Sequence, residues 1–373
     1  MNILITSLRA PVSMEWARLL QPDKTRIFGC DSFCFPVGRF MPNIHYFRLP
    51  EIKKHFDEYG RIIKKWINKV DLVIPTCEDI FWLAQLDLTD RERQKCFMPP
   101  REILLQLHHK HDFFAILPKC DKIAFPKTGL IQKHDDIVFD QGRPSLLKPV
   151  FSRFGHDVIR NVSPENCKAL KITENRQWVM QEYIHGKSLC NFFISQNGRL
   201  IAHAAYRPKW LINNAAASFF EPVVDERMEN FARKFCQHLN FTGQAAFDFV
   251  DDGEKLWVVE CNPRATSGIH LFSGSLHVNP QGELEFSGSL KTRPLRIGCS
   301  LPLLFSWPAI KNKQFKMLWR DFRCSEDVLA SLPFYAAGLS FAELSFKAWR
   351  QKQSLSAAST ADMEYNGENL WKI

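Results

Sequence analysis

Apolar and polar positions along the first hundred residues follow two different periods in turn. Short apolar runs such as NILITS are bounded by polar residues, as in buried strands, and they alternate with stretches whose apolar residues recur at helical spacing. The expected strands are residues 2–7, 26–32 and 71–76, and the expected helices are residues 12–20, 51–69 and 78–86. Such alternation is typical of a parallel sheet with helices on both faces. We therefore expect a Rossmann-like α/β domain at the start of the chain.

The pattern changes after about residue 103, where strand-like segments follow one another closely. They are residues 145–150, 177–184, 190–206, 244–250 and 255–261. The third of them contains Asn197-Gly198, a dipeptide that tight hairpin turns favour. These segments predict an α+β region, and the basic and aromatic residues that follow it predict a mostly helical extension.

Composition and charge narrow the class of protein. Apolar residues make up 45% and charged residues 24% of the 373 positions, which is ordinary for a globular protein with substantial cores. The formal net charge is +9, but Lys and Arg are spread along the chain, which favours an anionic small ligand over nucleic acid. The 11 cysteines include no C-x-x-C pair, and no signal peptide or membrane-length apolar run is evident. We expect a cytoplasmic protein.

The segment WVVECNPRATSG, residues 257–268, ends an apolar strand with polar residues at every second position. Glu260, Asn262 and Arg264 are expected on one face of the strand, because alternate side chains share a face. One interpretation is a strand end with solvated polar residues. The other is a site for a hard cation and the anion that it carries.

Asp248 lies on the preceding strand, across the turn DDGE. A three-residue loop, Asp251-Asp252-Gly253, would place Asp248 and Glu260 on the same face, whereas a two-residue Asp252-Gly253 turn would separate them. We expect the three-residue loop. Carboxylate and amide oxygens would then suit Mg²⁺, although an acidic hairpin in solvent is the better explanation when the hairpin is considered alone.

Two further segments have the features of a nucleotide site. Lys148 ends a strand and precedes a short loop with Ser152 and Gly155, whose backbone N–H groups can fold over phosphates. The strand end at residues 181–184, Gln-Glu-Tyr-Ile, can present backbone groups to a purine beside an apolar wall. Each signal is weak alone, since a surface turn or a strand end would look the same.

In their order and spacing, these segments resemble the ATP-grasp superfamily of carboxylate–amine ligases. The resemblance covers about residues 103–272, and it rests on a lysine before a helix, Lys-Pro with a loop of small residues, QEYI-x-G, an aspartate on a strand, and E-x-N-P-R twelve residues on. The N-terminal segments TSLRAPVSMEWARLL and IPTCEDIFWLA also resemble a bacterial branch of this superfamily whose substrates are mostly unassigned.

The resemblance implies three domains. A preceding α/β domain would occupy residues 1–102, and the ATP-grasp domain would occupy residues 103–285. Its small lobe would lie at about residues 110–190 and its large lobe at about 190–285. An extension over residues 286–373 would pack on the ATP-grasp domain. Its aromatic and basic residues could touch a membrane, but folding back over the cleft as a cap is the simpler explanation.

The resemblance also implies roles for individual residues. Lys110, Lys148, Ser152 and Gly155 would hold the ATP phosphates, and Gln181, Glu182, Tyr183, Ile184 and Ser188 would surround the rest of the nucleotide. Asp248, Glu260 and Asn262 would ligate Mg²⁺ or Mn²⁺. Arg264, Lys148 and Arg207 would act on the reacting groups, and Arg9, Thr76, Glu78, Arg264, Ser267 and Gly268 would line the substrate site.

The implied reaction is ATP-dependent joining of a carboxylate to an amine through an acyl phosphate, with residues 151–156 and 206–218 as a mobile lid. Its partners would be small molecules, without nucleic acid or membrane, and a homodimer is compatible with the resemblance. The chain departs from the family at Ser188, where a glutamate usually binds the ribose. A phosphotransferase and a non-catalytic nucleotide-binding module therefore remain as alternatives.

Overall fold

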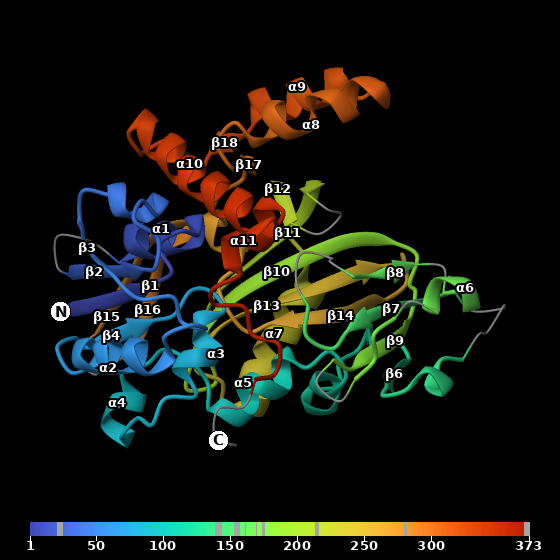
Figure 1. Ribbon diagram of the computed structural model, residues 1–373, viewed down its shortest axis with the longest axis horizontal. Helices are drawn as coiled ribbons and strands as arrows, with labels where there is room; N and C mark the ends of the chain where they lie inside the picture. Colours follow the sequence, from blue (N-terminus) through green and yellow to red (C-terminus); the bar gives the residue numbers. More distant parts are fainter. Residues whose placement is uncertain are drawn as a thin grey trace.

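The computed structural model describes residues 1–20, 25–138, 144–152, 157–160, 162–168, 170–173, 176–212, 216–279 and 282–368. They form a parallel N-terminal sheet, a large mixed sheet, a small antiparallel sheet, a separate hairpin and a group of C-terminal helices (Figure 1). The α/β fold expected from the sequence is confirmed.

The N-terminal sheet is parallel and has the order β3-β2-β1-β4. Its strands are β1 (Asn2–Thr6), β2 (Arg26–Asp31), β3 (Ile44–Arg48) and β4 (Leu72–Ile74). Ile3 and Ile5 pack with Trp16 of α1 (Pro11–Leu19), and Leu4 packs with Ile63 of α2 (Phe56–Ile67) on the other face. Both faces are covered, which explains why the strands read as continuous apolar runs.

The large mixed sheet has the order β18-β17-β12-β11-β10-β13-β14-β5. Its strands are β5 (Ile123–Ala124), β10 (Lys187–Gln196), β11 (Arg199–Ile212), β12 (Ala216–Val223), β13 (Gly243–Asp251), β14 (Leu256–Asn262), β17 (Leu295–Arg296) and β18 (Glu326–Asp327). One face is covered by α7 (Glu226–Leu239), where Phe193, Phe235 and Phe247 form an aromatic core. Asn197 and Gly198 both have positive φ in the β10–β11 turn, as the Asn-Gly dipeptide predicts.

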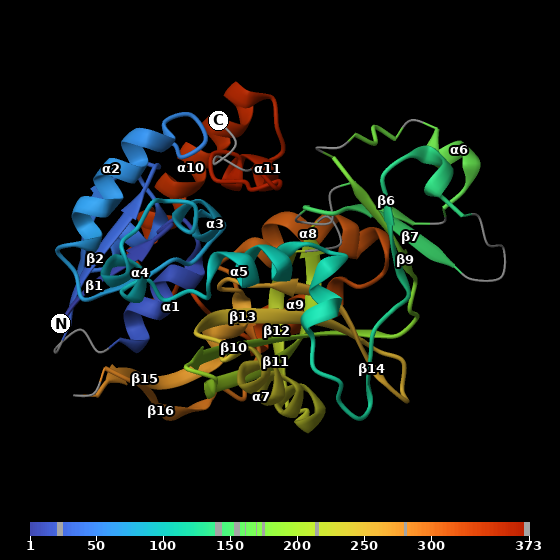
Figure 2. The same cartoon turned by 90° about the horizontal axis from the view of Figure 1, so that it is seen from below.

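The smaller sheet has the order β6-β9-β7-β8 and stands beside the large one (Figure 2). Its strands are β6 (Thr128–Ile131), β7 (Ser145–Pro149), β8 (Ile159–Arg160) and β9 (Trp178–Glu182). A separate hairpin consists of β15 (Phe272–Val278) and β16 (Leu284–Leu290). The remaining helices are α3 (Asp79–Leu83), α4 (Asp90–Gln94), α5 (Arg101–His108), α6 (Pro164–Cys167), α8 (Ser300–Lys311), α9 (Phe315–Cys324), α10 (Phe334–Gln351) and α11 (Leu355–Thr360), with 3-10 turns η1 (Val37–Phe40), η2 (Asp112–Ile116), η3 (His134–Asp136) and η4 (Ser267–Leu271).

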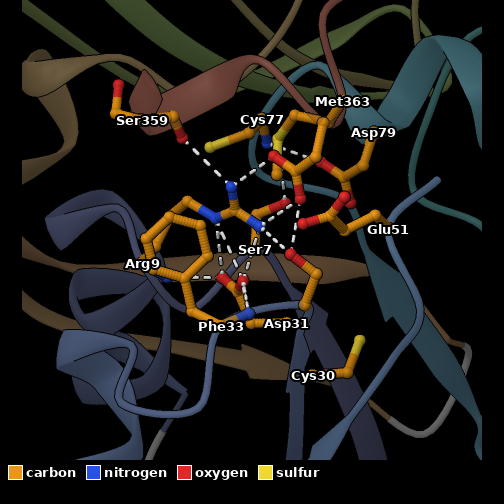
Figure 3. Close-up of polar contacts among 12 residues, drawn as sticks. Ser7, Arg9, Cys30, Asp31, Phe33, Glu51, Cys77, Asp79, Ser359 and Met363 are labelled. Atoms are coloured by element: carbon orange, nitrogen blue, oxygen red, sulfur yellow. Dashed lines mark hydrogen bonds and ion pairs between the residues drawn. The ribbon is translucent and has the colours of Figure 1, made fainter. Parts of the chain in front are cut away.

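The C-terminal segment returns to the carboxyl end of the N-terminal sheet. The Arg9 guanidinium donates to Asp31 and to Asp362, each at 2.6 Å, and it also reaches the Ser359 carbonyl (Figure 3). Ser32 donates to Asp362 as well. We call Arg9, Asp31, Ser32 and Asp362 the Arg9 cluster. The sequence predicted contact of the extension with the ATP-grasp domain, and it gave no sign of this contact with the first strands.

Residues after Asp362 continue along the same region. Trp82 donates its indole N–H to the Met363 carbonyl, and the Tyr365 N–H donates to the Glu78 carboxylate. The Tyr365 ring then lies against Phe151, which follows β7. The last described residues therefore join the N-terminal domain to the segment that follows β7.

The ionisation of Asp362 follows from its surroundings. Burial alone would raise its pKa, but the charge of Arg9 and the hydrogen bonds from Arg9 and Ser32 lower the pKa of Asp362 to about 2. A carboxylate with a lowered pKa stabilises the fold at pH values above its unfolded pKa of about 4. That contribution is lost as the pH falls through about 2.

We predict that Asp362→Asn destabilises the protein at neutral pH by about 2–3 kcal/mol, because the buried Arg9 loses a charged partner. The difference from wild type should shrink between about pH 4 and pH 2, where wild-type Asp362 itself becomes protonated. Urea unfolding across this pH range measures both effects. Asp57→Asn on the exposed face of α2 is the control, and equal midpoints for Asp362→Asn and Asp57→Asn at pH 7 would contradict the prediction.

Candidate active site

The β13–β14 hairpin positions the carboxylates of the candidate site. Asp251 pairs with Leu256, so the turn contains the four residues 252–255, and the expected three-residue loop is wrong. With a four-residue turn and regular pairing, Asp248 would lie opposite Val259, and Glu260 would point to the other face of the sheet. The turn alone would therefore separate the two carboxylates.

A β-bulge at Val259 restores the expected arrangement. The register shifts next to Asp248, so that Asp248 pairs with Glu260 and the extra residue Val259 has no partner across the strand. An extra residue reverses the alternation on its strand. Asp248, Glu260 and Asn262 consequently share one face of the large sheet, opposite to the face that α7 covers.

Hydrogen bonds link these side chains to one another and to Arg264. The Asn262 amide nitrogen lies 3.3 Å from an Asp248 carboxylate oxygen, and Arg264 donates to the Asn262 amide oxygen at 3.1 Å. Glu260 lies 3.4 Å from the ammonium group of Lys110, which is only 3% exposed. The carboxylates of Asp248 and Glu260 and the amide of Asn262 thus lie together with the cations of Lys110 and Arg264.

Lys148 crosses from the small sheet to the large one. Its ammonium group donates to the Gln181 side-chain oxygen at 3.0 Å and to the Val259 carbonyl at 3.2 Å. The second acceptor is the carbonyl of the bulged residue. Lys110, just after α5, donates to the Ser152 carbonyl at 2.8 Å in the loop after β7. The two lysines therefore connect the small lobe, the loop and the acidic strand.

Burial and charge shift the pKa values of this group in opposite directions. Burial, followed by the charge of Glu260, raises the pKa of Asp248 to about 6. Burial favours protonation of Glu260 too, but Lys110 and Lys148 outweigh it and lower the pKa of that carboxyl. Burial lowers the pKa of Lys148 to about 8. Asp248 and Glu260 are adjacent, half-buried carboxylates, and a divalent cation would stabilise their two negative charges. Their oxygens and the Asn262 amide oxygen are hard donors that fit Mg²⁺.

The residues expected around the nucleotide base end β9. Gln181 is held by Lys148 and Thr128, and Glu182 accepts from the Lys127 N–H at 3.2 Å. The Tyr183 N–H donates to the Pro144 carbonyl at 2.8 Å, so this N–H is engaged and only the carbonyl remains for a base. Ile184 is half-buried.

Ser188 is exposed and lies in β10, two residues before Cys190, which pairs with Asp248. Because alternate residues share a face, Ser188 lies on the same face as the acidic residues. The described part of the phosphate loop includes Ser152, whereas Gly155 lies outside the described residues. Of the expected lid, residues 206–212 belong to β11 and 216–218 to β12, so most of that segment is strand and the expectation of a loop there is wrong.

Arg207 is not brought to the site. It pairs with Glu221 across β11 and β12, and its guanidinium lies 3.1 Å from that carboxylate. Its neighbour Tyr206 pairs with Cys190 on the face of Asp248, so Arg207 points to the opposite face. The prediction that Arg207 acts on the reacting groups stays untested, and in this geometry Arg207 lies on the face opposite to Asp248.

Ser267 and Gly268 begin η4, close behind Arg264 in the chain. A Cβ atom at Gly268 would lie 2.4 Å from the Cβ of Phe192, so the glycine is required by close packing of η4 on the sheet. Ser267 is half-buried beside it. The packing role explains Gly268 without a substrate contact.

Three residues expected to bind substrate through the N-terminal domain have partners within the protein. Arg9 is enclosed by the Arg9 cluster, Thr76 is fully buried and donates to the Thr6 carbonyl, and Glu78 accepts from the Tyr365 N–H. The expectation that Arg9 and Glu78 face a substrate stays a prediction; in the structure both residues contact the C-terminal segment. Cys77 lies close enough to both Arg9 and Arg264 for their charges to act on its thiol. Burial raises the pKa of its thiol to about 12, while the charges of Arg264 and Arg9 both act to lower it.

His109, His111 and Asp112 form a second candidate cluster beside Lys110. Their ligand atoms lie within 4.8 Å of one another. The Asp112 N–H already donates to His109, and the Asp112 carboxylate contacts His111 at 2.8 Å. Hydrogen bonds within one turn thus account for the cluster.

Sequence reasoning missed two groups at the site. The Val259 carbonyl binds Lys148 only because of the bulge, and a bulge has no reliable sequence signal here. Cys190 pairs with Asp248, and the alternation of β10 from Ser188 could have identified it.

Comparisons with known proteins agree with this geometry. The family model described as ATP-grasp domain matches residues 122–268. A search of curated proteins found no match.

Several solved structures share the fold. The ADP complex of N5-carboxyaminoimidazole synthetase from Staphylococcus aureus is 15% identical, with a TM-score of 0.60 over 83% of this chain and 86% of that one. N5-carboxyaminoimidazole ribonucleotide synthetase from Thermotoga maritima is 13% identical, with a TM-score of 0.56 over 79% and 78%. L-amino acid ligase from Bacillus licheniformis is 14% identical, with a TM-score of 0.53 over 72% and 68%. The family match and the site between the two sheets together show that this chain carries an ATP-grasp domain, which includes residues 122–268.

Proposed function

We propose that this protein is an ATP-dependent ligase that activates a carboxylate as an acyl phosphate and joins it to an amine. The observation that carries the proposal is the convergence of Asp248, Glu260 and Asn262 on one sheet face, opposite the ammonium groups of Lys110 and Lys148. The similar structures named as ligases and synthetases support the same chemistry.

The first step requires neutralisation of phosphate charge. A substrate carboxylate oxygen attacks the γ-phosphorus of ATP, the bond to the β-phosphate oxygen breaks, and ADP leaves. Phosphoryl transfer asks the protein mainly for positioning and for positive charge around the transferred group. Lys110 and Lys148 supply that charge from buried positions. Asp248, Glu260 and Asn262 would hold Mg²⁺, which would supply further positive charge to the phosphates when bound.

The second step needs a group that stabilises an oxyanion. The amine attacks the carbonyl carbon of the acyl phosphate, and inorganic phosphate leaves. Arg264 can pair with a carboxylate or phosphate through two N–H groups, and Asn262 fixes its orientation at 3.1 Å. The pocket for the acid would lie between Arg264 and Cys77, beside Ser267, instead of at Arg9.

A phosphotransferase and a non-catalytic nucleotide-binding module are the alternatives. Ser188 stands where the family usually has a ribose-binding glutamate, which favours weaker nucleotide binding.

Hydroxylamine trapping tests the proposed reaction without knowledge of the amine. Hydroxylamine converts an acyl phosphate into a hydroxamate, so incubation with ATP, Mg²⁺ and pooled carboxylic acids should give a hydroxamate and one ADP per product. A phosphorylated product without a hydroxamate would indicate a phosphotransferase. Nucleotide binding without any turnover across the pool would indicate the non-catalytic module.

Replacement of the acidic ligands should abolish turnover. Glu260→Gln keeps the size of the side chain but removes its charge, and we expect kcat for ADP release to fall by about a hundred- to thousandfold. Glu254→Gln, on the exposed turn of the same hairpin, is the matched control and should keep full activity. Equal rates for the two variants would refute the assignment of Glu260.

Replacement of the bridging lysine should weaken nucleotide binding. Lys148→Met removes a charged hydrogen-bond donor, and we expect Kd for ATP, measured by calorimetry, to rise about 10- to 100-fold. Lys255→Met, exposed on the β13–β14 turn, should leave Kd unchanged. An unchanged Kd for a folded Lys148→Met variant would exclude a phosphate contact.

A further inference from the structure

Large apolar side chains are exposed on the C-terminal helices α8, α9 and α10. Trp307 is 77% exposed, Trp349 is 76% exposed and Phe334 is 95% exposed. We call the following set the C-terminal apolar face: Leu303, Leu304, Trp307, Ile310, Phe315, Met317, Trp319, Phe334, Tyr335, Leu339, Phe341, Phe346 and Trp349. A concentration of exposed aromatic residues of this size marks an interaction surface, because single exposed apolar residues are normal but clusters are not.

The first helix of this face, α8, packs against the large sheet through its buried side. Leu301 and Ala309 of α8 are buried with Phe219 of the large sheet. On the outer side, Leu303, Trp307 and Ile310 recur at intervals of four and three residues and form one stripe. The stripe is therefore not left over from an incomplete core, since α8 already has its own contact with the sheet.

The third helix, α10, has the same organisation over a greater length. Ala336 and Ala348 are buried, whereas Tyr335, Leu339, Phe346 and Trp349 lie on one exposed stripe. The rings of Phe346 and Trp349 contact each other. Figure 1 shows α8, α9 and α10 along one edge of the molecule, away from the small sheet of the candidate site.

Basic side chains accompany the apolar ones. Lys316, Arg320 and Arg323 of α9 line a cavity of about 470 Å³ together with Trp319 and Cys324. Arg323 lies over the Trp319 ring, and Arg320 also contacts Asp321 at 3.2 Å. Residues 300–352 contain eight lysines and arginines against four aspartates and glutamates. This region is therefore apolar and cationic at the same time.

We propose that the C-terminal apolar face docks on the surface of a bilayer that contains anionic phospholipid. Exposed Trp, Phe and Leu beside Lys and Arg are the composition of helices that lie in the membrane interface, with the basic groups on the headgroups. The cavity lined by Lys316, Arg320 and Arg323 takes a lipid phosphate. None of the helices that the structure describes combines the length and apolar character of a bilayer-crossing segment, so the attachment is peripheral.

Charge argues against a second copy of the chain as the occupant. In a twofold dimer the same patch meets itself, and the excess of basic residues on this face would repel its own copy. An anionic bilayer offers the opposite charge. The proposal does not depend on the proposed ligase reaction, and it revises the expectations that the extension caps the cleft and that no membrane is involved.

Vesicle flotation tests the proposal with the full chain. The protein should float with vesicles of phosphatidylcholine and phosphatidylglycerol, and much less with phosphatidylcholine alone. The double variant Trp307→Ser/Trp349→Ser should lower the partition coefficient about tenfold or more, since two exposed indoles no longer enter the interface. Val224→Ser, which removes a 94% exposed apolar side chain elsewhere, is the control and should bind as wild type does.

A charge-reversal pair separates the electrostatic contribution. Lys316→Glu/Arg320→Glu should weaken binding to anionic vesicles by about 20-fold or more, because each basic residue at the surface contributes about fivefold. Arg61→Glu/Lys65→Glu on the exposed side of α2 has the same spacing and charge change and should have little effect. Added salt should weaken wild-type binding to anionic vesicles.

Three results would overturn the proposal. The first is the absence of flotation with anionic vesicles, and the second is equal loss of binding in the α2 control and the α9 variant. The third is a concentration-dependent dimer that Trp307→Ser/Trp349→Ser dissolves, without vesicle binding, which would make the face a contact between copies. Thermal melting shows whether each variant is folded, and because the altered side chains are exposed we expect wild-type midpoints.

Discussion

The candidate site depends on one irregularity in strand pairing, the β-bulge at Val259. The four-residue turn by itself would direct Asp248 and Glu260 to opposite faces of the large sheet, and the extra residue brings them to the same face. The bulge also turns the Val259 carbonyl to Lys148 of the small sheet. A single inserted residue thus determines both the pairing of the carboxylates and the contact between the two lobes. Bulges are enriched beside active sites for this kind of reason, since they redirect side chains without breaking the sheet.

Two buried cations, Arg9 and Lys148, differ in the number and charge of their hydrogen-bond acceptors. Arg9 has two carboxylate partners, a serine hydroxyl and a backbone carbonyl, so its charge and its donors are matched within the protein. The hydrogen-bond acceptors described for Lys148 are an amide oxygen and a carbonyl, both neutral. The carboxylates of Glu260 and Asp248 act on the charge of Lys148 from nearby, without a described hydrogen bond to it. The sequence could not make this distinction, because Asp362 is 353 positions away from Arg9.

Local signals in the sequence account for much of the fold. Alternation of apolar runs and helical stretches predicted the parallel N-terminal sheet, and Asn197-Gly198 predicted the β10–β11 hairpin. Asp248 and Glu260 were predicted to share one face of the sheet, and they do, but the predicted three-residue loop was wrong. Turn propensities count the residues of a turn and do not detect a bulge farther along the strand. The fold of the segment around Arg207 was wrongly predicted for a similar reason: a long strand, β11, continues through residues that read as a polar loop. Contacts of the C-terminal segment are tertiary, and no local pattern reports them.

The Arg9 cluster has a consequence for the order in which the protein is made. During translation Arg9 emerges from the ribosome long before Asp362, which lies 353 positions later in the chain. Until then, the nascent N-terminal sheet carries a guanidinium group with one of its two carboxylate counterions missing, at the strand ends where Tyr365 and Met363 will later pack. The contacts of Arg9 in the N-terminal sheet therefore cannot be complete before residue 362 has been synthesised, and a nascent chain that stalls earlier keeps a guanidinium group that lacks one of its two carboxylate partners.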